Sequence, residues 1–180
     1  MSKRQDIAIT AGLWLFAMAA AASAEPTGRL PDASASTTAP VSGHCVSMTA
    51  IDFQSDNSLN ASTTSSNFVN VPNALISFTQ GGAGNGCVIV TFNADAWAPS
   101  GRLLQVRTLL DGAVVAQPGL MQLSGDDDEN NNGKWSRAHS ATFILPSVAP
   151  GAHTIAVQYA SGNSGFRVYL YKHSTVIQHP

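Results

Sequence analysis

Charged side chains are scarce in this 180-residue chain, which carries 9 Lys and Arg against 11 Asp and Glu. Residues 25–180 hold 7 of the basic and 10 of the acidic side chains, with Lys134 and Lys172 as the only lysines. A nucleic-acid partner requires clustered Lys and Arg that displace counterions from phosphates. The sequence therefore predicts no nucleic-acid partner and, for the same reason, no electrostatic attachment to a membrane surface.

Long apolar runs are also missing, apart from one stretch from Ile7 to Ala22. It is shorter than the roughly 20 residues that span a bilayer. Lys3 and Arg4 precede it and Ala22-Ser23-Ala24 follows. A basic start, an apolar centre and a small-x-small site make a secretory signal peptide, here of bacterial style. We expect residues 1–24 to be this signal, cleaved after Ala24. The protein would then be secreted, periplasmic or at the cell surface, without a membrane segment. An uncleaved membrane anchor is the competing interpretation.

Cysteine is limited to Cys45 and Cys87. An even count in an exported chain predicts a disulfide, and the loop it closes would contribute up to about 4 kcal/mol in the chain-entropy model. Two separate buried thiols are the alternative. A reactive pair is disfavoured because no basic neighbour or CxxC spacing promotes a thiolate.

Segments with helical periodicity are absent from the remainder. Residues 25–43 are rich in Pro, Ala, Ser and Thr, which predicts a flexible leader. Residues 44–180 contain short β-branched and aromatic runs separated by Gly, Pro, Asn and Asp, which predicts one all-β domain. The expected strands are Cys45–Phe53, Phe68–Val71, Ala74–Thr79, Cys87–Asn93, Arg102–Leu110, Ala113–Ala116, Leu120–Leu123, Trp135–Leu145, His153–Ala160, Phe166–Tyr171 and Thr175–Gln178.

Alternation is clearest near the end of the chain. Ile155, Val157 and Tyr159 share one strand face, and Phe166, Val168 and Leu170 share another. Asp111-Gly112 is a hairpin signal, and Asn163-Ser164-Gly165 is expected to form a turn. Many short antiparallel strands without crossover helices predict an antiparallel β-sandwich of jelly-roll type, preceded by the helix of the signal peptide.

The stretch from Pro150 to Tyr159, a Pro-Gly turn followed by His-Thr-Ile-Ala-Val, resembles the late strands of extracellular bacterial β-sandwich modules, including C1q-like and carbohydrate-binding jelly rolls. Val106 to Gly112, ending in Asp-Gly, is similar to the strand and turn that precede it in such modules. The resemblance implies an architecture and carries over no ligand-binding residues.

The most unusual local composition is Asp126-Asp127-Asp128-Glu129 followed by three Asn and a Gly. Carboxylate and amide oxygens are ligands that Ca²⁺ prefers, although the alternating spacing of an EF-hand loop is absent. A solvated loop is the simpler interpretation. Ca²⁺ is the only cofactor that the sequence suggests.

No catalytic motif is recognisable. The sequence holds no Gly-x-Ser-x-Gly, and its acids are too few to signal a glycosidase pair. We predict that the chain is not an enzyme. The five histidines show no metal-ligand spacing, and His153 is expected to make turn hydrogen bonds. His173 and His179 lie near the C-terminal end, where order is often poor.

Trp97 and Trp135 are the aromatic side chains best placed in sequence to stack on a sugar, although Trp more often packs in a core. The leading hypothesis is an exported, non-catalytic β-sandwich that binds an extracellular glycan or protein through the loops around Trp97 and Trp135. One alternative is a structural or assembly subunit of a surface oligomer. The Cys45–Cys87 spacing is similar to that of fimbrial subunits, but the tail lacks their penultimate Tyr. A hydrolase with an unrecognised site is the other alternative.

Overall fold

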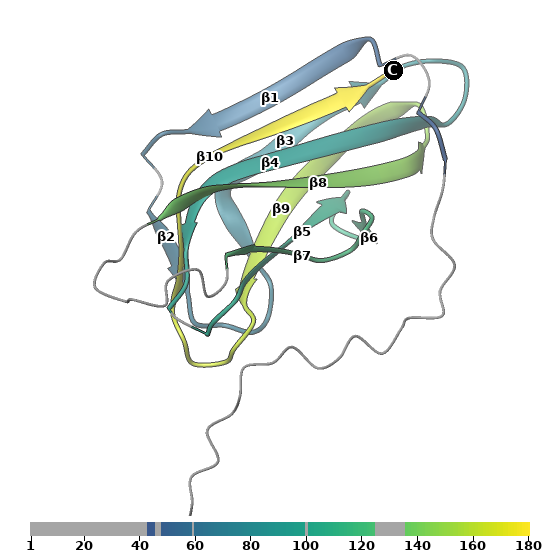
Figure 1. Cartoon of the computed structure of the whole chain (residues 1–180). Coiled ribbons are helices and arrows are strands. Elements are labelled where there is room, and N and C mark those ends of the chain that lie inside the picture. Colours follow the sequence, from purple (N-terminus) through teal and green to yellow (C-terminus); the bar gives the residue numbers. More distant parts are fainter. Residues whose placement is uncertain (1–42, 46–47, 59, 100, 125–135) are drawn as a thin grey trace, which may run out of the picture. The chain divides into compact units, whose positions relative to one another are not determined.

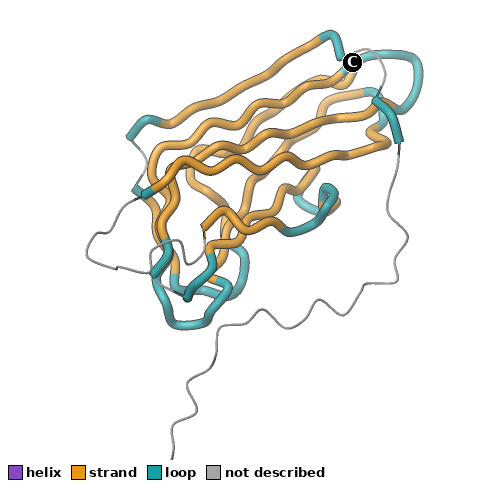
Figure 2. Tube along the Cα trace, viewed as in Figure 1, coloured by secondary structure: helices purple, strands orange, loops and turns teal. Residues whose placement is uncertain are grey.

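The computed structural model describes residues 43–45, 48–58, 60–99, 101–124 and 136–180, and within them the chain forms strands and no helix (Figure 2). The predicted signal peptide, most of the leader and the acidic loop lie outside these residues. No helix in the described ranges has the length and apolarity needed to cross a membrane. The strands are β1 (Ala50–Asp56), β2 (Ala61–Thr63), β3 (Val69–Gln80), β4 (Gly86–Trp97), β5 (Leu104–Leu110), β6 (Val114–Val115), β7 (Met121–Ser124), β8 (Arg137–Val148), β9 (Gly151–Ser161) and β10 (Val168–His179).

The strands form two antiparallel sheets (Figure 1). In sheet A the order is β1-β10-β4-β8, and β2 also pairs with β10. In sheet B the order is β3-β9-β5-β6, and β7 also pairs with β5. The predicted antiparallel β-sandwich is confirmed at this level. The narrower C1q-like or carbohydrate-binding type is not confirmed.

The core lies between the inner faces of the two sheets. Alternate residues of β4 and β9 are buried, as expected for strands with one face on a core. Ile155, Val157 and Tyr159 share the inner face of β9, which confirms the predicted alternation. The largest fully buried side chains include Phe92, Phe143, Leu104, Ile155, Leu170 and Ile177.

The sequence divided two strands that the structure keeps whole. Pro72 and Asn73 separate the expected runs Phe68–Val71 and Ala74–Thr79, yet β3 continues through them with a register shift and a positive φ of 57° at Asn73. Likewise β10 continues through Lys172, where a register shift falls between Leu170 and His173. The shift in β10 is a β-bulge with one extra residue, and the shift in β3 accommodates three extra residues. Neither ends its strand.

Three further expectations need correction. The short strand β2 was not predicted, because its sequence Ala-Ser-Thr shows no alternation of apolar residues. The first strand begins at Ala50 rather than at Cys45. Phe166 does not share the inner face with Val168 and Leu170. It precedes β10, is partly exposed, and has the Arg102 guanidinium 3.6 Å from its ring centroid.

Both predicted turns are confirmed. Asp111 and Gly112 have positive φ values of 51° and 70° and connect β5 to β6. The turn between β9 and β10 contains Gly165 with a φ of 84°, and the amide of Phe166 donates to the carbonyl of Asn163 over 3.2 Å.

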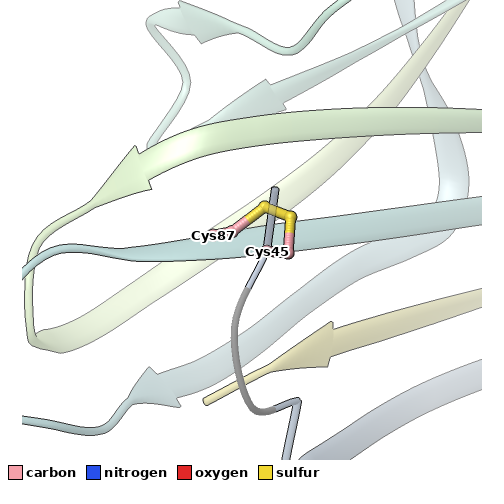
Figure 3. The surroundings of a disulfide bond; sticks show 2 residues. All are labelled: Cys45 and Cys87. Carbon is pink, nitrogen blue, oxygen red and sulfur yellow. A yellow bond between two sulfur atoms is a disulfide. The ribbon is translucent and has the colours of Figure 1, made fainter. Parts of the chain in front are cut away.

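Cys45 and Cys87 form the predicted disulfide, with their Cα atoms 5.2 Å apart (Figure 3). Cys87 lies at the start of β4, and Cys45 lies in the segment before β1. The bond therefore attaches the start of the described chain to a central strand of sheet A. A disulfide of this kind is typical of extracellular and periplasmic proteins.

Candidate functional site

The outer face of sheet A carries a row of small polar side chains. Directly opposite residues of an antiparallel pair lie on the same face of the sheet. Ser55 pairs with Ser174, Ser174 with Asn93, and Asn93 with Ser140, so the row crosses β1, β10, β4 and β8. The Asn93 amide donates to the Ser174 hydroxyl over 3.4 Å.

An open basin of about 420 Å³ follows this row. We call it the polar basin. Asp95 and Lys172 also line it, so one negative and one positive side chain border a group of hydroxyls and amides. Lys172 occupies the bulge of β10, which interrupts the regular register beside the basin. The lining residues are Ser55, Asn57, Asn93, Ala94, Asp95, Ala138, His139, Ser140, Lys172, His173 and Ser174.

Three aromatic rings lie in contact with one another along the ends of β4 and β10. We call Trp97, Tyr169 and Tyr171 the aromatic run. Trp97 and Tyr169 are register partners with ring centroids 5.2 Å apart, and the Tyr169 and Tyr171 rings are parallel at 6.2 Å. All three are half-buried, so each keeps part of its ring accessible.

The aromatic run and the polar basin adjoin on the same strands. Residues two apart in a strand point to the same face, which places Asp95 beside Trp97 on β4. On β10, Lys172 follows Tyr171 directly. The arrangement combines half-buried rings with hydroxyl, amide, carboxylate and ammonium groups, the mixture of apolar surface and oriented polar groups that small-ligand sites use.

Of the ligand-binding and metal-ligating residues predicted from the sequence, the structure places only Trp97. Trp97 is the last residue of β4 and is half-buried, so it belongs to the sheet face and not to the loop that follows. Trp135 and the proposed calcium ligands Asp126, Asp127, Asp128 and Glu129 lie outside the described residues, and their roles stay predictions. No group of three metal-ligating side chains occurs within the described ranges.

Two histidines were expected in a poorly ordered end, and that expectation is wrong. His173 and His179 are both buried on β10. His179 Nε2 is 2.9 Å from the Asp52 carboxylate, and its Nδ1 is 3.0 Å from the Pro180 main-chain oxygen. Both residues therefore belong to the packed sandwich.

His173 lines the floor of the polar basin but directs its ring to the interior. Its Nε2 is 3.1 Å from the carbonyl oxygen of Pro72 on the opposite sheet, and its ring contacts Phe92 at 5.7 Å. Burial lowers the pKa of His173, against a smaller opposing effect of the Pro72 carbonyl and the Asp56 carboxylate. The neutral imidazole is thus the favoured form, and its place is structural.

Sequence reasoning missed most of the basin. Asn93, Ser140 and Ser174 are ordinary strand residues in sequence, and only the strand order brings them together. Tyr169 and Tyr171 stand two residues apart around Leu170 in the sequence, which is a signal for part of the aromatic run. Nothing in the sequence indicated that Trp97 pairs with Tyr169.

Comparisons with known proteins assign no family to this chain. No family model matches the chain. No curated protein matches it either. Among solved structures, a similar one is dimeric latent PorU from Porphyromonas gingivalis, at 12% identity and a TM-score of 0.45. The match covers 77% of this chain and 14% of that one, so the matched region is a small part of the PorU chain.

Proposed function

We propose that this protein is an exported, non-catalytic β-sandwich that binds an extracellular glycan on the outer face of sheet A. The observation that carries the proposal is the aromatic run beside the polar basin. Sugar rings present apolar C–H faces and many hydroxyls. Half-buried aromatic rings suit the former, and Ser, Asn, Asp and Lys side chains suit the latter.

The acid content of the basin supports binding over hydrolysis. Glycosidases of the common type place two carboxylates on either side of the scissile bond. Among the described residues, Asp95 is the only carboxylate that lines the basin.

A hydrolase is the alternative that one observation favours, since His139 and Asp95 line the same basin. However, His139 pairs with Ala94, which is buried on the inner face, whereas Asp95 pairs with the exposed Ala138. The side chains of His139 and Asp95 therefore leave opposite faces of the sheet, which disfavours a catalytic pair. Release of product from any bound glycan over a long incubation would favour the hydrolase.

The proposed compartment is the periplasm, the cell surface or the surrounding medium. The disulfide supports it, because such bonds persist in oxidising environments. The predicted signal peptide points to the same compartment. Amino-terminal sequencing of the exported protein tests it, with Glu25 as the expected first residue.

A glycan array followed by calorimetric titration of the best ligand tests the binding function. We expect Trp97→Ala to weaken binding about 30-fold, because loss of an aromatic anchor typically costs about 2 kcal/mol. Phe166→Ala is the matched control, since Phe166 is a partly exposed aromatic residue that lines neither the basin nor the aromatic run. It should leave binding unchanged.

Two outcomes would contradict the proposal. Absence of binding to every glycan would remove the ligand class. Binding that Trp135→Ala abolishes and Trp97→Ala leaves intact would move the site to the loop before β8. Circular dichroism of each variant separates loss of contact from loss of fold.

A further inference from the structure

Strand β1 forms an edge of sheet A. It pairs with β10 through all seven residues from Ala50 to Asp56. Among the described residues, no strand pairs with its other side. Its outward N–H and C=O groups are therefore available to a further strand, which is the partner that an open edge recognises.

The side chains of β1 reverse the usual pattern of a sandwich strand, in which apolar residues face the core and polar residues face solvent. Phe53 and Ile51 are 74% and 64% exposed, the highest values among the large hydrophobic residues described. Asp52 and Gln54 alternate with them on the face toward sheet B, and Asp52 contacts His179 there. An edge strand that turns its largest apolar groups outward gains stability when a second apolar surface covers them.

The other edges of the sandwich carry several features that discourage strand addition, whereas β1 carries only the inward-pointing carboxylate of Asp52, which contacts His179. β3 contains Pro72 and a bulge, and β8 contains Arg137 and Pro146. In sheet B the opposite edge consists of the short strands β6 and β7. Proline, bulges, basic residues and short length all block edge pairing. β1 holds no Lys, Arg or Pro and no register shift.

We propose that β1 pairs with β1 of a second copy of this chain, antiparallel and about a twofold axis perpendicular to the sheet. Sheet A of each copy would then continue into the other, with both outer faces on the same side. The isologous contact uses one surface twice, as closed dimers do. Phe53 would lie at the centre of the seam.

The charges of β1 and the length of the overlap together select the register. If the outer faces of both copies lie on the same side, the twofold axis must pass beside a single residue of β1, which then lies opposite its own copy. Centring on Asp52 would oppose two copies of that carboxylate, and centring on Gln54 would oppose Asp52 and Asp56. Centring on Phe53 opposes Asp52 to Gln54 and Asp56 to Ala50, so no like charges face each other. Centring on Ile51 or Ser55 would also keep like charges apart, but it would pair only three residues of each β1. Centring on Phe53 pairs all seven, so the complementary register is the one in which the two Phe53 rings meet.

Sedimentation equilibrium of the purified protein over a range of concentrations tests the association. We expect a monomer–dimer equilibrium in the wild type. Phe53→Lys should raise the dissociation constant about 100-fold or more, because it brings two ammonium groups together at the seam. Ile144→Lys is the matched control: it changes a partly exposed apolar residue of β8, on the far edge of the same sheet. It should leave the equilibrium unchanged.

Cysteine cross-linking tests the register. Phe53→Cys should form a covalent dimer under mild oxidation, because opposite Cα atoms lie about 4.5–5.5 Å apart, within disulfide reach. Ser55→Cys should not, because its copies would be about 13 Å apart along the strands. A wild type that stays monomeric, a dimer that Phe53→Lys leaves intact, or a cross-link at Ser55→Cys without one at Phe53→Cys would each overturn the proposal. Unchanged circular dichroism spectra confirm that the variants fold.

Discussion

Asp111 attaches the β5–β6 turn to the start of β9. Its carboxylate accepts hydrogen bonds from the Thr154 amide at 2.8 Å and the Thr154 hydroxyl at 3.3 Å, and it is 2.8 Å from His153 Nδ1. The residue also adopts a positive φ of 51°, which Asn and Asp tolerate better than most residues. The hydrogen bond to His153, followed by that from the Thr154 amide, lowers the pKa of Asp111.

We expect Asp111→Ala to lower the free energy of unfolding by about 2 kcal/mol. The substitution removes the three acceptor contacts and places Ala in a left-handed conformation. Asp111→Asn is the matched control, because it keeps one carbonyl acceptor for Thr154 and still tolerates the positive φ. It should cost clearly less. Urea unfolding of both variants measures the difference, and equal losses would show that the acceptor contacts contribute nothing.

At this scale the sequence predicted local roles better than distant ones. The Asp111-Gly112 turn and the hydrogen bond of His153 to Ala149 follow from neighbouring residues, and the structure confirms them. The burial of His179 depends on Asp52, which lies on a strand at the other end of the chain. Pairings of this kind depend on the strand order, which the sequence alone does not specify.

At the scale of strands, local signals located most elements but misjudged their limits. A polar or proline residue inside a run was treated as a strand end, whereas β3 and β10 accommodate such residues because pairing with a neighbouring strand resumes after each irregularity. The candidate site shows the same limit. Its row of Ser55, Ser174, Asn93 and Ser140 exists only through pairing of four strands, and no run of sequence contains it.

The disulfide joins the segment before β1 to β4 and should add to the free energy of unfolding. Closing a loop across a sequence separation of 42 gives up to about 4 kcal/mol of stabilisation in the chain-entropy model. We therefore expect Cys45→Ala with Cys87→Ala to lower the free energy of unfolding by about 2–4 kcal/mol. Denaturant unfolding of this double variant against the wild type, both without reductant, measures the loss.

Reduction of the wild type provides the control for that measurement. If cross-linking is the source of the stability, the wild type in reductant should approach the double variant, and the double variant should not respond to reductant. A double variant as stable as the oxidised wild type would mean that the cross-link adds nothing to the stability of the fold.

For the molecule as a whole, two histidines give stability opposite dependences on pH. His153 lies between the Asp111 carboxylate and the carbonyl of Ala149, and these contacts raise its pKa. The contribution of His153 to the free energy of unfolding is complete below pH 6.5, the pKa of histidine in the unfolded chain. It is lost as the pH rises through the pKa of the folded state. Burial lowers the pKa of His173, so its contribution is complete above 6.5 and is lost as the pH falls toward the folded value.

We therefore expect the melting temperature to be highest near pH 6.5 and to decline on both sides. Thermal unfolding from pH 5 to pH 8.5 measures the profile. His153→Gln should flatten the alkaline side alone, and His173→Gln, whose amide retains a donor for the Pro72 carbonyl, should flatten the acid side alone. The double variant should lose both slopes. A slope that survives the matching substitution would assign it to another group, because Gln does not titrate in this range.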